Sequence, residues 1–287
     1  MTGKLAKIAR RVAVRLAVFL LVLFIALILF VLLCEDLFIY HPEKTAAGTP
    51  VADPIPGART VEECLFTASD GVRLNALYVR AGTEARRTLL WFHGNAGNLQ
   101  QRRGTIADFL AIGVDVFLFD YRGYGKSEGE PSEEGLYLDG LAAYDYLTKV
   151  KGVPPEKVIF FGKSLGGAIA VETATKRPCP ALIIQSAFTS TREMASVIIP
   201  IFPGRWFMKS DFDSKSKIGG ISAPKLFIHS PKDEVIPYRL GKDLYSAAAA
   251  PKEFYEITDA LHNETFVVGG KAYWEKVKSF IDRSVRH

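Results

Sequence analysis

The sequence predicts an α/β domain with a mostly parallel sheet of about eight strands, helices on both faces, and one transmembrane helix in front. Two observations support this prediction. Short apolar runs alternate with segments of helical length from about residue 61 to the C-terminus, which is the pattern of a parallel sheet. A separate run of nineteen uncharged residues, 16–34, lies near the N-terminus.

The uncharged run reads LAVFLLVLFIALILFVLLC. As a helix it would extend over roughly 28 Å, close to the thickness of a bilayer's hydrocarbon core. A cleaved signal peptide has a shorter apolar region and a small-residue cleavage site, whereas Glu35 and Asp36 follow here. A lipoprotein signal ending at Cys34 is disfavoured, because such signals have a small residue where this chain has Leu33. We therefore expect residues 16–34 to cross a membrane.

The charges around this run predict its orientation. The first fifteen residues hold five Lys or Arg and no acid, and basic flanks stay on the cytoplasmic side. We expect residues 1–15 to be cytoplasmic and the main domain to lie on the other side. The net charge of +5 comes from 36 basic and 31 acidic residues. Without the basic flank the chain is neutral, so its charge does not indicate nucleic-acid binding.

The elements of the main domain follow a linker predicted over residues 35–60, much of it rich in Pro, Gly, Ala and Thr. The domain itself is predicted over residues 61–287. A bridge between Cys64 and Cys179 and two free thiols remain alternatives. Strands are expected at 61–66, 72–79, 88–93, 114–120, 158–162, 181–187, 225–230 and 253–257, with helices near 99–112, 132–150, from 165, at 237–249 and at the C-terminus. In such sheets active residues gather at the carboxyl ends of the strands.

A lone serine stands where a strand is expected to become a helix. Gly162-Lys163-Ser164-Leu165-Gly166 matches G-x-S-x-G, in which a sharp turn exposes the serine hydroxyl at the top of the sheet. Glycines two residues away relieve the crowding of that turn. The alternative is a glycine-rich turn with a capping serine. The position between a strand and a helix favours Ser164 as a nucleophile.

A serine nucleophile needs a base and an acid, in the chain order Ser, Asp or Glu, His. His262 lies between the last strand and the last helix, so it is the predicted base. Asp233, just after the strand at 225–230, is the predicted acid, with Glu234 and Asp259 as alternatives. An ordinary loop carboxylate is the competing interpretation of Asp233.

Two backbone donors are expected to stabilise the oxyanion. One is the N–H of Leu165, directly after the nucleophile. The other comes from the loop WFHGNAGN, residues 91–98, through the N–H of Asn95 or Ala96. A plain turn is the alternative for this loop. A phosphate-binding loop fits less well because no G-K-[ST] follows.

These residues resemble the α/β-hydrolase superfamily, and more closely its small, membrane-anchored members. The matching pieces are FHGNAGN, DYRGYGKSEGEPSEEGLYLD, GKSLGG, SAFTS, IHSPKDEVIP and LHNET. The resemblance implies an α/β-hydrolase fold and assigns Ser164 as nucleophile, Asp233 as acid, His262 as base, and Asn95 with Leu165 as oxyanion donors. Characterised relatives include depalmitoylases, lysophospholipases and related esterases. Ser230 and Leu261 depart from the family pattern.

The expected activity is hydrolysis of carboxylic esters or thioesters, with lipid-like acyl substrates and without a metal or organic cofactor. Only about thirty residues separate SAFTS from the next strand, so a small cap or none is expected. The apolar stretch 196–209 holds Trp206 and Phe207, which are predicted either to contact an acyl chain or to pack in the core. A peptidase or amidase with the same residues, and an inactive binding module, are the competing functions.

Overall fold

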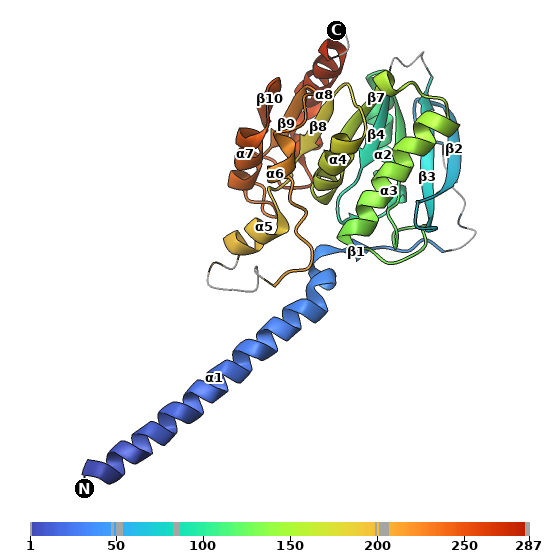
Figure 1. Ribbon diagram of the computed structural model, residues 1–287. Coiled ribbons are helices and arrows are strands. Elements are labelled where there is room, and N and C mark those ends of the chain that lie inside the picture. Colours follow the sequence, from blue (N-terminus) through green and yellow to red (C-terminus); the bar gives the residue numbers. More distant parts are fainter. Residues whose placement is uncertain are drawn as a thin grey trace.

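The computed structural model of the protein describes residues 2–46, 49, 54–82, 87–198, 200 and 207–284. One long helix extends away from a domain of alternating strands and helices (Figure 1). This helix, α1 (Thr2–Ile39), contains the predicted span 16–34. None of its most apolar eighteen-residue window is buried against the domain. Its length and composition therefore suit a membrane span.

An eight-stranded sheet forms the centre of the domain, in the order β10-β9-β8-β7-β4-β6-β3-β2. The pairs β2–β3 and β3–β6 are antiparallel and all other neighbours are parallel. The prediction of a mostly parallel sheet of about eight strands is therefore confirmed. The strands are β2 (Ala58–Thr67), β3 (Arg73–Ala81), β4 (Arg87–Phe92), β6 (Val114–Phe119), β7 (Val158–Lys163), β8 (Leu182–Gln185), β9 (Lys225–His229) and β10 (Lys252–Glu256).

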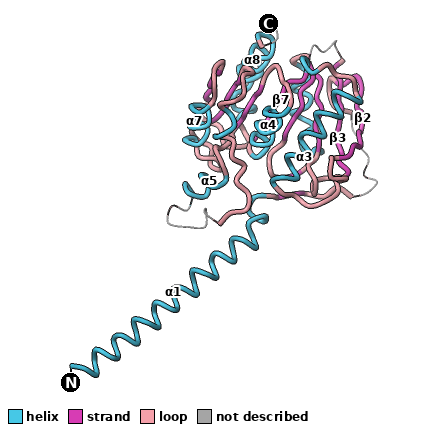
Figure 2. Tube along the Cα trace, viewed as in Figure 1, coloured by secondary structure: helices cyan, strands magenta, loops and turns pink. Residues whose placement is uncertain are grey.

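Helices cover both faces of the sheet (Figures 1 and 2). On one face, Leu136, Ile169 and Leu240 bring α3, α4 and α7 into the core. On the other face, Phe109 and Val277 do the same for α2 and α8. A sheet buried on both faces needs apolar residues at successive positions, which explains the continuous apolar runs of its strands. The helices are α2 (Arg103–Ala111), α3 (Glu133–Asp145), α4 (Leu165–Lys176), α5 (Thr191–Ile198), α6 (Lys215–Ile218), α7 (Tyr238–Ala247) and α8 (Thr265–Arg283), with short helical turns at Leu99–Arg102, Tyr146–Val150 and Pro155–Lys157.

The first part of the predicted linker is folded onto the domain. The carboxylate of Glu35, which is buried, accepts the N–H groups of Lys209 and Ser210 at 2.8 and 2.7 Å. After it, β1 (His41–Pro42) pairs with β5 (Ala96–Gly97) in a small parallel sheet. Figure 1 shows β1 next to the C-terminal end of α1, against the domain. The start of the predicted linker therefore contacts the domain through the carboxylate of Glu35 and through backbone groups, and backbone contacts leave no mark on composition.

Between β8 and β9 the described residues form only α5 and α6, in agreement with the small cap expected there. Met194 and Val197 of α5 pack against the core. The three cysteines, Cys34, Cys64 and Cys179, are free. Of the two alternatives for Cys64 and Cys179, the structure therefore shows the free thiols.

Candidate active site

Ser164 lies in the turn between β7 and α4, where the sequence predicts it. Its φ of 54° and ψ of −124° are costly for a residue with a side chain. Two backbone hydrogen bonds hold the turn: the N–H of Ser164 donates to Gln185 O, and that of Gly167 donates to Ser164 O, both at 2.9 Å. Backbone strain of this kind concentrates at functional sites.

Two glycines make this turn sterically possible. A Cβ on Gly166 would lie 2.1 Å from the carbonyl oxygen of Phe92 and 2.4 Å from that of His93. A Cβ on Gly162 would lie 2.6 Å from the carbonyl oxygen of Gly166. Only residues without a side chain allow so close an approach. The start of α4 therefore packs directly on the end of β4, which brings the turn beside the loop that follows β4.

The imidazole of His262 is bound to the carboxylate of Asp233. The Nδ1 atom lies 2.9 Å from Oδ1 and 2.8 Å from Oδ2. His262 precedes α8, Asp233 follows β9, and both are buried. With Nδ1 donating to the carboxylate, the lone pair of Nε2 is available to accept a proton.

Other groups fix Asp233 as well. His229 Nε2, at the end of β9, lies 3.3 Å from Oδ2, and the N–H groups of Val235 and Ile236 donate to Oδ1 at 3.0 and 2.8 Å. Burial alone would raise the pKa of Asp233. The hydrogen bonds from His229 and His262 outweigh burial and hold this pKa well below its ordinary value. The carboxylate is therefore charged at neutral pH and can orient the imidazole of His262.

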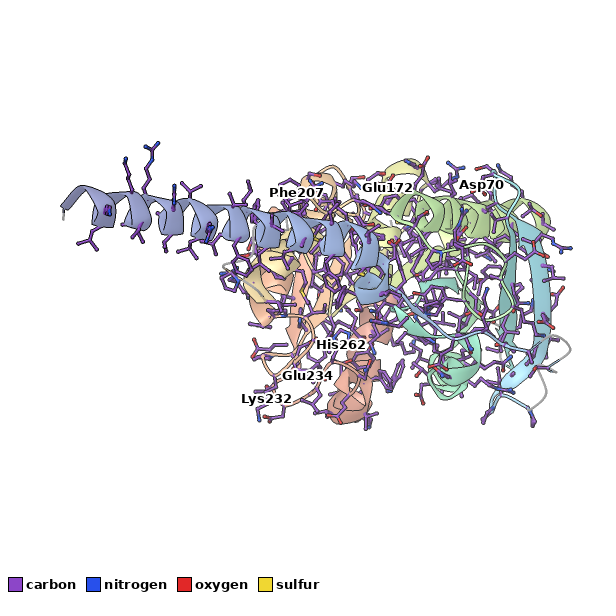
Figure 3. All side chains as sticks on the ribbon, turned by 90° about the horizontal axis from the view of Figure 1, so that it is seen from below. Asp70, Glu172, Phe207, Lys232, Glu234 and His262 are labelled. Carbon is purple, nitrogen blue, oxygen red and sulfur yellow. The ribbon has the colours of Figure 1, made fainter. Side chains whose placement is uncertain are left out.

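The alternative acids take other positions. The Oε2 atom of Glu234 accepts the backbone N–H of His262 at 2.8 Å, and Asp259 forms an exposed ion pair with Lys232 at 2.8 Å. Figure 3 shows Lys232, Glu234 and His262 in one region of the domain, away from Asp70 and Glu172. Of the three acids considered from sequence, only Asp233 reaches the imidazole ring.

Backbone of two elements lies next to Ser164. A Cβ on Gly94 would lie 3.5 Å from the Cβ of Ser164, so the loop after β4 passes directly beside the serine. Asn95 is the next residue in this loop. Leu165 begins α4, and the first N–H groups of a helix have no partner within the helix. Both predicted oxyanion donors thus belong to backbone next to Ser164.

Ser164 and His262 line one open cleft with a volume of about 510 Å³. Trp91, Val235 and Phe266 form apolar parts of its wall. In the described chain no hydrogen bond joins the Ser164 hydroxyl to His262, and such bonds are often long before substrate binds. No group of three or more His, Cys, Asp or Glu side chains among the described residues could hold a metal ion.

The predicted substrate contacts differ from the lining of this cleft. Phe207 is 41% exposed and is not one of the lining residues. Trp206 lies outside the described residues. For Val197, in the same apolar stretch, the core-packing alternative holds.

The segment DYRGYGKSEG, residues 120–129, binds the loop after β4 and the helix α3. The carboxylate of Asp120 accepts the N–H of Leu99 at 2.8 Å, which ties the end of β6 to the loop after β4. Arg122 forms ion pairs with Asp139 and Asp70 at 2.8 and 2.7 Å. These contacts join loops to α3 and account for the segment as a structural element.

Comparison with known proteins agrees with this geometry. A family model described as the alpha/beta hydrolase fold matches residues 87–208. The alpha/beta hydrolase domain-containing protein WAV2 of Arabidopsis thaliana is 32% identical over 274 residues, which cover 87% of this chain and 88% of that protein. This chain belongs to the α/β-hydrolase superfamily. Among its relatives, alpha/beta hydrolase domain-containing protein 17B of Xenopus tropicalis is 34% identical over 227 residues, covering 78% of this chain and 76% of that one.

Solved structures show the same fold. The Pyrococcus furiosus esterase Pf2001 has a TM-score of 0.66 and 19% identity, with 86% of this chain and 98% of that chain covered. The prediction that this is an α/β-hydrolase superfamily member is confirmed by these comparisons.

Sequence reasoning about this α/β-hydrolase member missed several residues of the site. His229 falls within the predicted strand 225–230, four residues before Asp233, and it contacts the Asp233 carboxylate. His41 was assigned to the linker, yet it lines the cleft. Lys163 and Arg102 also line the cleft. The position of Lys163 directly before the serine is a signal that it lies at the cleft, whereas nothing in the sequence points to His41 or Arg102.

Proposed function

We propose that this protein is a membrane-tethered serine hydrolase that cleaves carboxylic esters or thioesters of lipid-like acyl groups. The observation that supports it best is the pair of contacts, 2.8 and 2.9 Å, between His262 Nδ1 and the Asp233 carboxylate, in the same cleft as the strained Ser164. Esterases are among the structural neighbours, which agrees with ester hydrolysis.

In the proposed reaction, Ser164 attacks the acyl carbon while His262 Nε2 takes its proton. The N–H groups of Leu165 and Asn95 stabilise the oxyanion, an interaction worth roughly 3–4 kcal/mol of barrier for each donor. His262 then protonates the leaving group, and water releases the acyl group from Ser164. Asp233 holds the imidazole and stabilises its charged form throughout.

A fluorophosphonate probe tests this proposal on the full-length protein in detergent. We expect labelling of the wild type and of Ser69→Ala, a matched control at an exposed serine, but not of Ser164→Ala. A folded wild type that is not labelled would support the binding-module alternative and refute the proposal. Activity on peptides but not on esters or thioesters would support a peptidase instead.

The tether and its direction belong to the same proposal. The exposed apolar α1 would cross the membrane, with the basic residues 1–15 in the cytoplasm and the domain on the other side. Protease treatment of sealed inside-out vesicles, whose cytoplasmic face is turned outward, checks the orientation. Digestion of the domain from the cytoplasmic face would contradict it.

A further inference from the structure

Two cationic side chains line the candidate cleft without a carboxylate partner. Lys163 directly precedes Ser164, and its Nζ donates to Asn263 Oδ1 at 2.8 Å. The guanidinium of Arg102 donates to the carbonyl oxygens of Ala96 and Asn98. Within the described ranges, neither cation has an acidic oxygen within 4 Å, although most other basic side chains of the domain form ion pairs.

The two cations also act on one another. Burial and the charge of Arg102 lower the pKa of Lys163 to about 8, so the ammonium is still mostly charged at neutral pH. Asp233 and Glu234 attract Lys163 from a greater distance, but both carboxylates are already bound to His262. Keeping two partly buried like charges in one cleft costs free energy that a bound anion would recover.

Acids near Arg102 do not neutralise it either. Asp120 and Glu43 exert an attraction on its guanidinium, yet neither forms an ion pair with it. Glu43 accepts a hydrogen bond from Gln101, and Asp120 accepts one from Leu99. The cleft is therefore lined by two cations without an ion-pair partner in the described part of the chain: Lys163, which precedes Ser164, and Arg102, which binds the carbonyl oxygens of Ala96 and Asn98.

We propose that Lys163 and Arg102 bind an anionic group, a phosphate or a carboxylate, that the acyl substrate carries within a few bonds of its scissile ester. This inference rests on the proposed function and names the substrate class of that site. Charge-assisted hydrogen bonds to an oxyanion are stronger than neutral ones. The apolar wall formed by Trp91, Val235 and Phe266 would contact the uncharged part of the same molecule.

Two matched substrate pairs test the proposal on the full-length protein in neutral detergent. The soluble pair is 4-nitrophenyl butyrate and the mono-4-nitrophenyl ester of glutaric acid, which adds a carboxylate to the acyl side. The lipid pair is a 1-acylglycerol and the corresponding 1-acylglycerol 3-phosphate, which adds a phosphate to the leaving group. We expect kcat/KM to favour the anionic member of at least one pair by on the order of tenfold. The pair that shows it identifies a soluble acid or a lipid headgroup as the source.

The Lys163→Gln variant links the preference to the cleft. We expect it to abolish most of the anionic preference, while Lys232→Gln, at an exposed lysine paired with Asp259, leaves the preference unchanged. The ratio of the two kcat/KM values is the readout, so a general loss of activity does not imitate the effect. Competitive inhibition by inorganic phosphate should also weaken in Lys163→Gln.

Two outcomes overturn the inference. One is a wild type that prefers the neutral member of both pairs, and the other is a preference that Lys163→Gln leaves intact. Fluorophosphonate labelling distinguishes a failure of this inference from a failure of the proposed function. A labelled wild type without anionic preference refutes only the anionic substrate, whereas a folded wild type without labelling refutes the hydrolase itself.

Discussion

The side-chain Nδ2 of Asn95 donates a hydrogen bond of 3.1 Å to the carbonyl oxygen of Ile39, the last residue of α1. The backbone oxygen of Asn95 accepts two more, from the N–H of His41 at 3.0 Å and from the hydroxyl of Tyr124 at 2.8 Å. The loop that carries a proposed oxyanion donor is therefore held by the end of the apolar helix and by a buried tyrosine.

Tyr124→Phe removes one of these bonds and leaves the ring in place. A hydrogen bond of this kind contributes about 0.5–1.5 kcal/mol, so we expect kcat to fall roughly three- to tenfold with KM little changed. Steady-state ester hydrolysis measures this change. Tyr137→Phe, which loses a hydroxyl bond to Glu133 in α3, is the matched control and should keep its kcat. Equal losses in both variants would contradict a role in positioning the loop.

Asp233→Asn should lower kcat by about 10³–10⁴-fold, because an amide holds the imidazole of His262 in the wrong tautomer. Glu234→Gln keeps an oxygen that can accept the His262 N–H, so we expect a loss of less than about tenfold. The rates of ester hydrolysis and of fluorophosphonate labelling both report the difference. Glu234→Gln being as damaging as Asp233→Asn would reject Asp233 as the acid.

Gly166→Ala should destabilise the domain by more than about 3 kcal/mol or prevent folding, because its Cβ would overlap the Phe92 carbonyl oxygen. Gly104→Ala, in α2, meets nothing within 4 Å and should stabilise by about 0.5–1 kcal/mol. Thermal unfolding of both variants gives opposite shifts in Tm. A Gly166→Ala variant as stable as the wild type would disprove the close packing.

Asp120 predicts a dependence of stability on pH. Burial raises its pKa to about 7, against the lowering effects of the Leu99 N–H and Arg102. The nearby ring of His93, 3.6 Å away, contributes the opposite slope, because burial lowers its pKa and the folded state therefore binds its proton less well than the unfolded state. Between pH 4 and 7 the carboxyl of Asp120 keeps its proton in the folded state and loses it in the unfolded state, so its own contribution to the stability falls as pH rises.

Asp120→Asn should remove the contribution of Asp120 and leave that of His93. Relative to the variant, we expect the wild type to lose up to about 4 kcal/mol of unfolding free energy from pH 4 to pH 7. Chemical denaturation at several pH values measures both proteins. Parallel curves would show that Asp120 does not titrate in this range.

Much of this arrangement could be predicted from the sequence. The apolar run and the glycines around Ser164 predict a strand at 158–162 and a helix from 165, and β7 and α4 match these bounds within a residue. Asp233 could be predicted as a nearby acid because it follows a buried strand. The sequence favours Asp233 over Glu234, and the coordinates show that Asp233 contacts the imidazole of His262 while Glu234 accepts its backbone N–H.

The remaining features depend on contacts that leave no pattern. The segment after Ile39 binds Asn95 and Gly125 through peptide groups, which every residue has. His229 reaches Asp233 only because Gly241, in α7, leaves room: a Cβ there would lie 2.0 Å from the imidazole. Arg102 enters the cleft from a short helical turn, and no spacing rule connects it to Ser164.

The buried carboxylate of Glu35 fixes the position of the domain relative to α1. Glu35 lies within α1, and its carboxylate accepts hydrogen bonds from the backbone N–H groups of Lys209 and Ser210. The end of the helix is therefore bound directly to the domain. Once α1 is embedded in a bilayer, as proposed, the cleft would sit at a constant height and tilt above the lipid. The protein would then meet acyl compounds only in a thin layer next to the lipid headgroups. Molecules dissolved far from the membrane would not reach the cleft.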